Sequence, residues 1–574
     1  MKKTIFLSLF IILAISIVFT NYNFSETIVG SDYAYYLPFL IINKSHFFSG
    51  DFVPSLFTSK VCGGFVDFAN PQNIFYSFKQ IIFNFTNITY FFSLTLFFYS
   101  SVGFIGSYLL LNKIFFCNKI NSVIGGFLFA FNGFYLSRFL IGHLGFLEFT
   151  ILPLFIYLII KSFNSSDKYH SRKFLLFAIF IIAYLIYSGS ISIFPYFLIS
   201  AFAVLIIYFD FHQFNLKLLR KFIVVTLFGL LLACHKIYLT FQLFSNIPRN
   251  LSYIAIDNPF GVIKFLINGI FGNIFFHNGN LYQNGFSIGW HEFSYAVGFL
   301  STIMLVMALF NKDFLNKYKI SLLGIALGFL IITLISTSSK FYELLLVDQI
   351  TVIPWRFLSV LILPIIILSV LGSNIILEKN FSYKILIVIS FLFIGLQLTS
   401  ISKSFYGDYK IQNQHLSFNT QPIKYIAAFT NQQDNNLAFP LMRNDLIFNH
   451  ASVLNCYEPL HGYRNEKMDL TKFKFNEIKK FPEVNILLGN PLELGNNMTN
   501  FYDPSCFLFP HENQCEPYDH FDLNNLENLK KLINGGNYEY NAPVLNSLLL
   551  TLNIILILSS VLYLLYLKIR KIIC

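Results

Sequence analysis

Long apolar runs dominate this sequence. Twelve runs of about 20 residues, the length that an α-helix needs to cross a bilayer, can be delimited: 4–21, 89–111, 120–137, 144–161, 173–188, 191–209, 221–238, 292–310, 319–336, 356–377, 383–400 and 545–567. Only 12% of the residues are charged, about half the share found in soluble domains. The pattern predicts a polytopic α-helical membrane protein with about 12 transmembrane helices.

The basic residues of the short loops predict the orientation. Every second short loop is basic, and the loops between them carry almost no charge; the basic side holds Lys113, Lys119, Lys161, Lys168, Arg172, Lys173, Lys217, Arg220, Lys221, Lys312, Lys317, Lys319, Lys379, Lys384, Lys568, Arg570 and Lys571. Basic loops stay in the cytoplasm. We therefore expect both termini inside, in a bacterial inner (cytoplasmic) membrane, and three long segments outside: 22–88, 239–291 and 401–543.

The same loops explain the net charge of +11, so we expect no nucleic-acid partner. The first run has Lys2 and Lys3 before it, as a signal peptide would, but no small-x-small cleavage site follows it. We therefore interpret it as a retained membrane anchor.

Three domains are expected. Residues 1–400 form a multi-helix membrane domain with outer loops 22–88 and 239–291, and residues 544–574 form the final transmembrane helix and a basic cytoplasmic tail. Residues 401–543 regain charge and turn signals and contain short β-like runs such as "ASVLNCYEPL". They predict an extracytoplasmic α+β or β-rich domain, in which Cys506 and Cys515 are close enough in sequence to close a disulfide loop; a loosely ordered region is the alternative.

The cytoplasmic loops are short and contain neither a P-loop nor a GxGxxG motif. Any chemistry is therefore expected on the outer face, where an activated group would come from a membrane lipid carrier. In the first outer loop, "NIFYSFKQIIF" has the apolar spacing of a helix that lies on the membrane surface.

Ionisable residues of the apolar runs gather at one level, just below the outer surface. These residues are Asp32, Arg138, His143, Glu148, His235, Lys236, His291, Glu292 and Arg356. Such residues are costly near membrane depth and usually face a cavity or a partner. Lys and Arg at helix ends also snorkel to the interface, but the acids are too short for this.

Five stretches carry a family resemblance: "GSDYAYYLPFL" (30–40), "GG…ANPQNIFYS" (63–77), "GGFLFAFNGFYLSRFLIGHLGFLEFTILPL" (125–154), "WHEFSYAVGFL" (290–300) and "VIPWRFLSVLILP" (352–364). In order and spacing they resemble the YfhO-like bacterial membrane proteins, within the GT-C superfamily of polyprenyl-phosphate-sugar glycosyltransferases. The resemblance implies a GT-C-like fold and transfer of a sugar from a polyprenyl-phosphate donor to an envelope glycan, lipid or protein. The sequence departs from the usual DxD or ExD pair, because Asp32 is followed by Tyr-Ala-Tyr.

Site roles follow from the resemblance and from the chemistry. Asp32 would be the acid of the first outer loop, acting as the general base or holding a divalent cation, Mg²⁺ or Mn²⁺; a solvated helix-terminal Asp is the alternative. His143 and Glu148 are further catalytic candidates. Arg356, then Arg138 and Lys236, would bind the donor phosphate, with Glu292 beside them. The alternatives are an interfacial anchor for Arg356, a hydrogen-bonded His143, and a Glu292 that only pairs with a base.

Two other functions compete. A transporter or flippase of lipid-linked saccharide would place polar residues at the bilayer midplane, often with internal repeats, and the sequence shows neither. A non-catalytic envelope assembly protein, in which the outer domain binds a partner, is the third interpretation.

Overall fold

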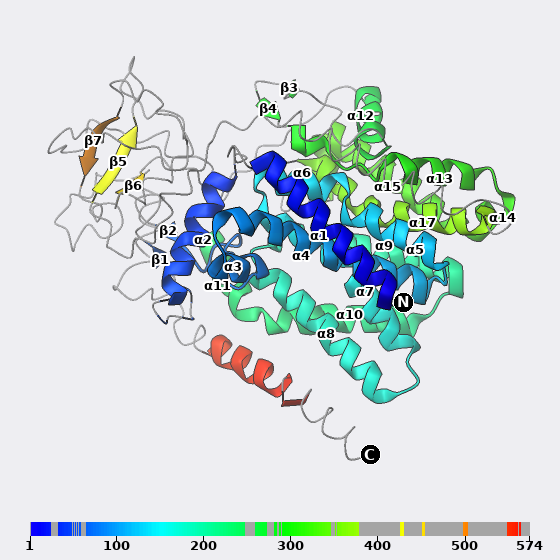
Figure 1. Cartoon of the computed structure of the whole chain (residues 1–574), viewed down its shortest axis with the longest axis horizontal. Helices are drawn as coiled ribbons and strands as arrows, with labels where there is room; N and C mark the ends of the chain where they lie inside the picture. The colour runs from blue at the N-terminus through cyan, green and yellow to red at the C-terminus, as the bar shows by residue number, and fades with distance from the viewer. Residues whose placement is uncertain are drawn as a thin grey trace.

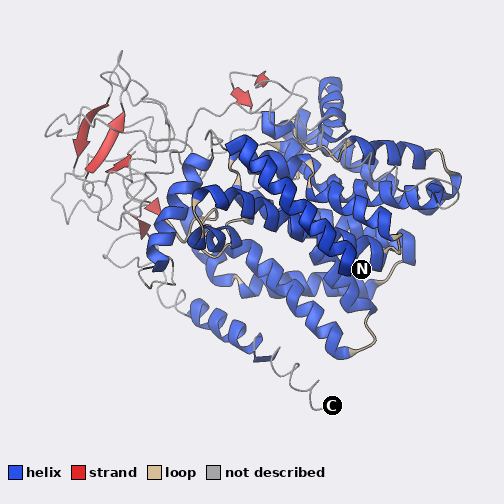
Figure 2. Ribbon diagram, in the orientation of Figure 1, coloured by secondary structure: helices blue, strands red, loops and turns tan. Residues whose placement is uncertain are grey.

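The computed structural model describes residues 2–24, 32–48, 65–246, 259–271, 281–283, 286–288, 290–345, 353–377 and 548–560, together with residues 50, 52, 54, 57–58, 351, 425–429, 451–453, 498–502 and 562–563. Helices make up nearly all of this part of the chain (Figure 2).

The helices follow one another in the order seen in Figure 1: α1 (Lys2–Phe24), α2 (Tyr33–Phe48), α3 (Phe78–Phe85), α4 (Ile88–Leu109), α5 (Lys119–Ala130), α6 (Gly133–Ile141), α7 (Leu152–Asn164), α8 (Lys168–Tyr187), α9 (Phe194–His212), α10 (Leu216–Leu232), α11 (Cys234–Asn246), α12 (Pro259–Phe271), α13 (Phe299–Leu309), α14 (Lys312–Lys317), α15 (Lys319–Thr337), α16 (Ser339–Leu344) and α17 (Ser359–Leu377). A last helix covers Leu548–Ser560. A π-turn, η1 (Leu110–Ile114), ends α4, and the 3₁₀ segments are η2 (Leu144–Ile151), η3 (Ile191–Ile193), η4 (Trp290–Phe293) and η6 (Pro354–Leu358).

Eight described helical segments are long and apolar enough to cross a membrane: Lys3–Asn21, Tyr90–Ile114, Lys119–Ile141, Leu144–Asn164, Lys168–Tyr187, Ile191–His212, Lys319–Thr337 and Pro354–Ile375. A ninth is obtained if Leu216–Leu232 and Cys234–Gln242, bent by 65° at their junction, form one broken span. These nine match nine of the predicted runs. The chain is a multi-pass membrane protein, although the predicted count of 12 is not reached in the described residues.

The other three predicted runs have different outcomes. Run 383–400 lies outside the described residues, and the described part of run 545–567 holds a shorter apolar helix, Leu548–Ser560. The prediction for 292–310 is wrong at its start, because the helix begins at Phe299. Before it, the backbone is extended: Tyr295 N donates to Gly269 O (3.0 Å), and Val297 N donates to Ile270 O (3.0 Å). Since α12 satisfies these amides, the segment needs no helix of its own.

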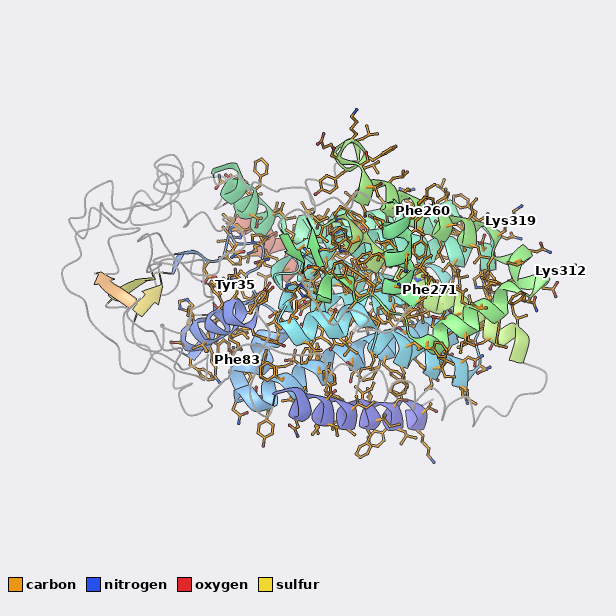
Figure 3. The ribbon with its side chains drawn as sticks, turned by 90° about the horizontal axis from the view of Figure 1, so that it is seen from above. Tyr35, Phe83, Phe260, Phe271, Lys312 and Lys319 are labelled. Carbon is orange, nitrogen blue, oxygen red and sulfur yellow. The ribbon has the colours of Figure 1, made fainter. Side chains whose placement is uncertain are left out.

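The helix ends meet at two opposite ends of the bundle. At one end, His212 contacts Ile114 O (3.2 Å), Asp210 accepts from Ser321 Oγ (2.6 Å), and Lys221 Nζ donates to Ser162 O (2.8 Å). We call this the basic end, because the predicted cytoplasmic loops lie there. Figure 3 shows Lys312 and Lys319 at this end, and Tyr35 and Phe83 at the other. The alternation predicted from the loops is therefore consistent with the contacts, whereas the side of the membrane stays a prediction.

Helix α3 packs at the end opposite the basic end. Ser77 caps it by accepting from Gln80 N (3.2 Å), as N-cap serines do. Lys79, Gln80, Phe83 and Asn84 are buried, whereas Phe78, Ile81 and Phe85 are exposed. The helix thus has the one-sided pattern expected of a segment that lies on a membrane surface.

Strands are few and short. β1 (Phe57–Thr58) pairs with β2 (Phe65–Val66), and β3 (Leu281–Gln283) pairs with β4 (Phe286–Ile288), both antiparallel. β5 (Tyr425–Phe429) is central in a three-stranded sheet, parallel to β6 (Ala451–Val453) and antiparallel to β7 (Met498–Tyr502). Apart from these three strands, the predicted outer domain 401–543 lies outside the described residues, as do Cys506 and Cys515.

Candidate functional site

Four segments that are distant in the sequence meet at the end of the bundle opposite the basic end. Asp32 precedes α2, and His143 follows Gly142, the C-cap of α6. His291 and Glu292 lie in η4, and Arg356 lies in η6 at the mouth of α17. Helix α6 also carries Arg138 in its last turn. We call these six residues the site cluster.

The first part of the site cluster is a carboxylate–imidazole pair. Asp32 Oδ2 lies 2.5 Å from His143 Nε2, and both side chains are mostly buried. Backbone contacts hold the two loops together: Asp32 N donates to Ile141 O (2.9 Å), and Tyr33 Oη donates to Phe139 O (2.6 Å).

Gly142 makes this close approach possible. Its φ is +85°, and a Cβ at this position would lie 2.3 Å from the backbone N of Tyr33. Only glycine adopts such a backbone without strain and without a side chain in the way.

The second part of the site cluster is a carboxylate between two guanidinium groups. Glu292 Oε2 accepts from Arg138 Nη2 at 2.7 Å and from Arg356 Nε at 2.9 Å. Arg356 Nη2 also donates to Glu292 Oε1, which makes this contact bidentate. Burial raises the pKa of Glu292, but the nearby Arg138 and Arg356 outweigh it and hold that pKa well below its ordinary value. Two cations share one anion, so the group carries a surplus positive charge.

His291 connects the two parts. Its ring lies edge-on to that of His143, with centroids 5.0 Å apart, and its Nε2 lies 3.5 Å from Glu292 Oε1. Burial lowers the pKa of His291 to about 4, although Glu292 opposes this shift. His291 is therefore neutral near pH 7.

A single aromatic ring lies against both parts. Phe146 stacks on His143 at 5.5 Å between centroids, and the guanidinium carbons of Arg138 and Arg356 lie 5.3 and 5.6 Å from its centroid. Cation–π contacts of this kind stabilise arginine in apolar surroundings. Two buried polar atoms of the site cluster, Arg138 Nε and His143 Nδ1, have no hydrogen-bond partner among the described residues.

A close backbone approach places η4 against α6. Gly133 N donates to Ala296 O (2.8 Å), and a Cβ at Gly133 would lie 2.7 Å from Ala296 N. The extended segment after η4 is thereby held on the first turn of α6, so that Glu292 faces Arg138 further along the same helix.

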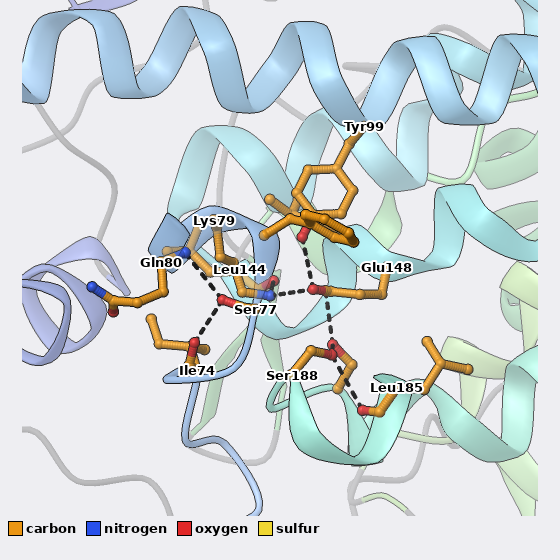
Figure 4. Close-up of polar contacts among 12 residues, drawn as sticks. Ile74, Ser77, Lys79, Gln80, Tyr99, Leu144, Glu148, Leu185 and Ser188 are labelled. Carbon is orange, nitrogen blue, oxygen red and sulfur yellow. Dashed lines mark hydrogen bonds and ion pairs between the residues drawn. The ribbon is translucent and has the colours of Figure 1, made fainter. Parts of the chain in front are cut away.

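Glu148, a predicted catalytic residue, is not brought into the site cluster. It accepts from Lys79 Nζ (2.6 Å), Tyr99 Oη (2.8 Å) and Ser190 Oγ (2.7 Å) in a fully buried network (Figure 4). Lys79 Nζ also donates to Leu144 O (2.9 Å), so that α3 is held against η2. Sequence reasoning missed Lys79; the only signal was a polar position on the inner face of the amphipathic run. Burial lowers the pKa of Lys79, against the pull of Glu148.

Lys236, a predicted phosphate ligand, also lies apart from the contacts of the site cluster. Its buried ammonium donates to Asn70 O (2.8 Å) and to Phe68 O, and it lies 4.5 Å from the centre of the Phe68 ring. It therefore holds the loop that contains Phe68 and Asn70 against the bend between α10 and α11.

A divalent cation fits the site cluster poorly. Ligand atoms of His143, His291 and Glu292 lie within 4.8 Å of one another, but both oxygens of Glu292 already accept from guanidinium groups. A metal ion there would face two fixed positive charges. The described partner of Asp32 Oδ2 is an imidazole and not a second carboxylate. The predicted cation at Asp32 stays a prediction.

No protein-family model matches the chain, and no curated protein matches it. The resemblance to YfhO-like proteins is therefore not confirmed. Among solved structures, the chain is similar to arabinofuranosyltransferase AftD from Mycobacteria, at 16% identity and a TM-score of 0.42. The match covers 69% of this chain and 26% of that protein. A likeness this distant assigns neither a family nor an activity to the chain.

Proposed function

We propose that this protein is a membrane glycosyltransferase of GT-C type, which transfers a sugar from a polyprenyl-phosphate donor to an envelope glycan, lipid or protein. One observation carries the proposal: the Asp32–His143 pair and the Arg138–Glu292–Arg356 group lie side by side at one end of the bundle. In the proposed orientation, with both termini in the cytoplasm of a bacterium, this end faces outward.

The reaction needs the two functions that these groups can supply. An acceptor hydroxyl loses a proton as its oxygen attacks the anomeric carbon, and a carboxylate–imidazole pair can take that proton. The bond from the anomeric carbon to the phosphate oxygen breaks, and the leaving polyprenyl phosphate gains negative charge. The surplus positive charge of the arginine group can stabilise that charge.

Arg356 is the better placed of the two arginines for contact with a phosphate. Its side chain is 20% exposed, whereas that of Arg138 is fully buried. Glu292 holds Arg356 in one orientation, and a preorganised guanidinium loses little entropy when it binds an anion. We infer that Arg356 contacts the donor phosphate, and that Arg138 and Glu292 orient it.

The test uses the purified full chain in detergent with a panel of polyprenyl-phosphate hexoses, pentoses and N-acetylhexosamines. Release of polyprenyl phosphate and covalent modification of an added glycan acceptor are both measured. Detergent removes any need for transport, so a transporter or an assembly protein gives no product. Absence of product with the whole panel, and unchanged lipid-linked saccharides and envelope glycans in a deletion strain, would overturn the proposal.

A further inference from the structure

The imidazole of His143 has two very different surroundings at its two nitrogens. Nε2 lies 2.5 Å from Asp32 Oδ2, whereas Nδ1 is buried and has no hydrogen-bond partner among the described residues. A buried polar atom without a partner costs free energy unless a ligand or a water molecule pairs with it. The hydrogen-bonding capacity of Nδ1 is therefore left unused by the described residues.

The contact at Nε2 decides which nitrogen carries the proton. An ionised carboxylate can only accept, so Nε2 must donate. In the neutral imidazole the lone pair then lies on Nδ1. Resting on the glycosyltransferase function proposed above, we propose that Nδ1 of His143 is the general base for the acceptor hydroxyl, and that Asp32 is a positioning residue acting through His143.

This assignment reverses the roles expected from the sequence, in which Asp32 was the base. Oδ2 of Asp32 is occupied by the contact with His143. A carboxylate behind an imidazole holds the tautomer and stabilises the imidazolium, as in the Ser-His-Asp arrangement. The backbone bond from Asp32 N to Ile141 O (2.9 Å) fixes the carboxylate behind the ring, as this role requires.

Charged groups of both signs surround the ring of His143. The titratable or charged groups near it in the described residues are Asp32, His291, Glu292, Arg138 and Arg356. Asp32, in direct contact, lies where its negative charge can stabilise the imidazolium that forms when the proton arrives.

The proton balance is closed. The acceptor O–H bond breaks and its proton moves to Nδ1, while the oxygen forms the new bond to the anomeric carbon. The electron pair of the anomeric C–O bond leaves with the phosphate. The imidazolium then returns its proton to solvent or to the departing phosphate, and the Nε2 proton stays in its bond to Asp32 throughout.

The decisive variant is His143→Gln, whose side-chain amide can still donate to Asp32 but has no basic nitrogen. We expect transfer to fall about 100- to 10,000-fold, the usual contribution of a general base. His212→Gln is the matched control, because this substitution also removes an imidazole that contacts a neighbour, in this case Ile114 O at the basic end. It should transfer at the rate of the unchanged chain.

One further measurement keeps the inference open to refutation if His143→Gln folds poorly. Added imidazole should restore part of the transfer to His143→Gly. A folded His143→Gln within a few-fold of the unchanged chain, or a folded His143→Gly that imidazole does not restore, would return the base to Asp32. Either result needs an active unchanged chain, so failure here is distinct from failure of the glycosyltransferase proposal, in which the unchanged chain gives no product.

Discussion

Arg356 and Arg138 bind the same carboxylate, yet only Arg356 reaches the surface. Arg356→Lys keeps the charge but loses the planar two-point contact. Because hydrogen bonds to charged groups contribute roughly 1.5–3 kcal/mol, we expect transfer at limiting donor to fall about tenfold or more, and further in Arg356→Ala. Steady-state rates at varied donor concentration measure this. The control is Arg172→Lys, which alters an exposed arginine that donates to Tyr563 Oη. Equal transfer rates for the unchanged chain, Arg356→Lys and Arg356→Ala would mean that Arg356 is only an interfacial anchor.

His291 should make the protein sensitive to acid. Its pKa is lowered to about 4 in the folded chain by burial, against about 6.5 in the unfolded chain. Between these values the unfolded chain binds a proton that the folded chain does not, so the free energy of unfolding falls as the pH drops from 6.5 to 4. The pKa of Glu292 is held below its ordinary value, so its contribution is lost only at still lower pH.

The measurement is the apparent melting temperature in detergent at pH 7.5 and pH 4.5. His291→Gln should reduce the drop between these two values, whereas His212→Gln should not. An equal drop in the unchanged chain and in His291→Gln would contradict a neutral, mostly buried His291.

At the scale of elements, the turn between α6 and η2 depends on Gly142. Gly142→Ala forces a left-handed backbone on alanine, at about 1–2 kcal/mol, and pushes its Cβ against the Tyr33 backbone. We expect loss of stability and a larger loss of transfer, because the clash separates Asp32 from His143. Gly324→Ala is the control, since in the described part of the chain no atom beyond the adjacent helix backbone lies within 4 Å of its Cβ position. Melting temperature and transfer rate are compared; a Gly142→Ala variant with unchanged transfer would disprove the positioning role of this turn.

The buried Lys79–Glu148 ion pair joins α3 to η2. Breaking one side of a buried ion pair leaves an unpaired charge and typically costs about 3–5 kcal/mol, whereas replacing both partners is often tolerated. We therefore expect Lys79→Met to destabilise strongly, and Lys79→Met combined with Glu148→Gln to recover much of that loss. Melting temperatures of the single and double variants measure the coupling. A stable double variant that transfers sugar supports a structural Glu148, and one that is inactive would restore its predicted catalytic role.

At the scale of the whole molecule, the orientation in the membrane is open to a direct test. Cys117 is buried, so it is a poor probe of its side of the membrane. Ser166 and Lys340 are exposed, and they lie in segments predicted inside and outside, respectively. In intact cells, an impermeant thiol reagent should label Lys340→Cys above the background of the unchanged chain, and should label Ser166→Cys only after lysis. The reverse pattern would place the site cluster in the cytoplasm and remove the argument for a lipid-linked donor.

The sequence by itself determined where most of the helices lie. Nine of the predicted apolar runs match described spans or the bent pair, because membrane insertion depends on the hydropathy of a continuous segment, which is a local property. The positions of ionisable residues at the ends of these runs also predicted that five of them lie near one surface of the membrane. These are Asp32, His143, Arg138, Glu292 and Arg356, and their side chains meet in the site cluster.

Only the tertiary structure decided how those residues pair. In the structure Glu292 lies between two arginines, Glu148 pairs with Lys79 and not with the site cluster, and Lys236 donates to a loop carbonyl. The tertiary structure also kept residues 294–298 out of a helix, because the amides of Tyr295 and Val297 donate to carbonyls of α12, and the carbonyl of Ala296 accepts from Gly133 N of α6. The physical reason is that ion pairs and backbone bonds between distant segments depend on packing. Close packing is in turn set by small residues such as Gly133 and Gly142, whose effect on a neighbour far along the chain leaves no periodic signal in the sequence.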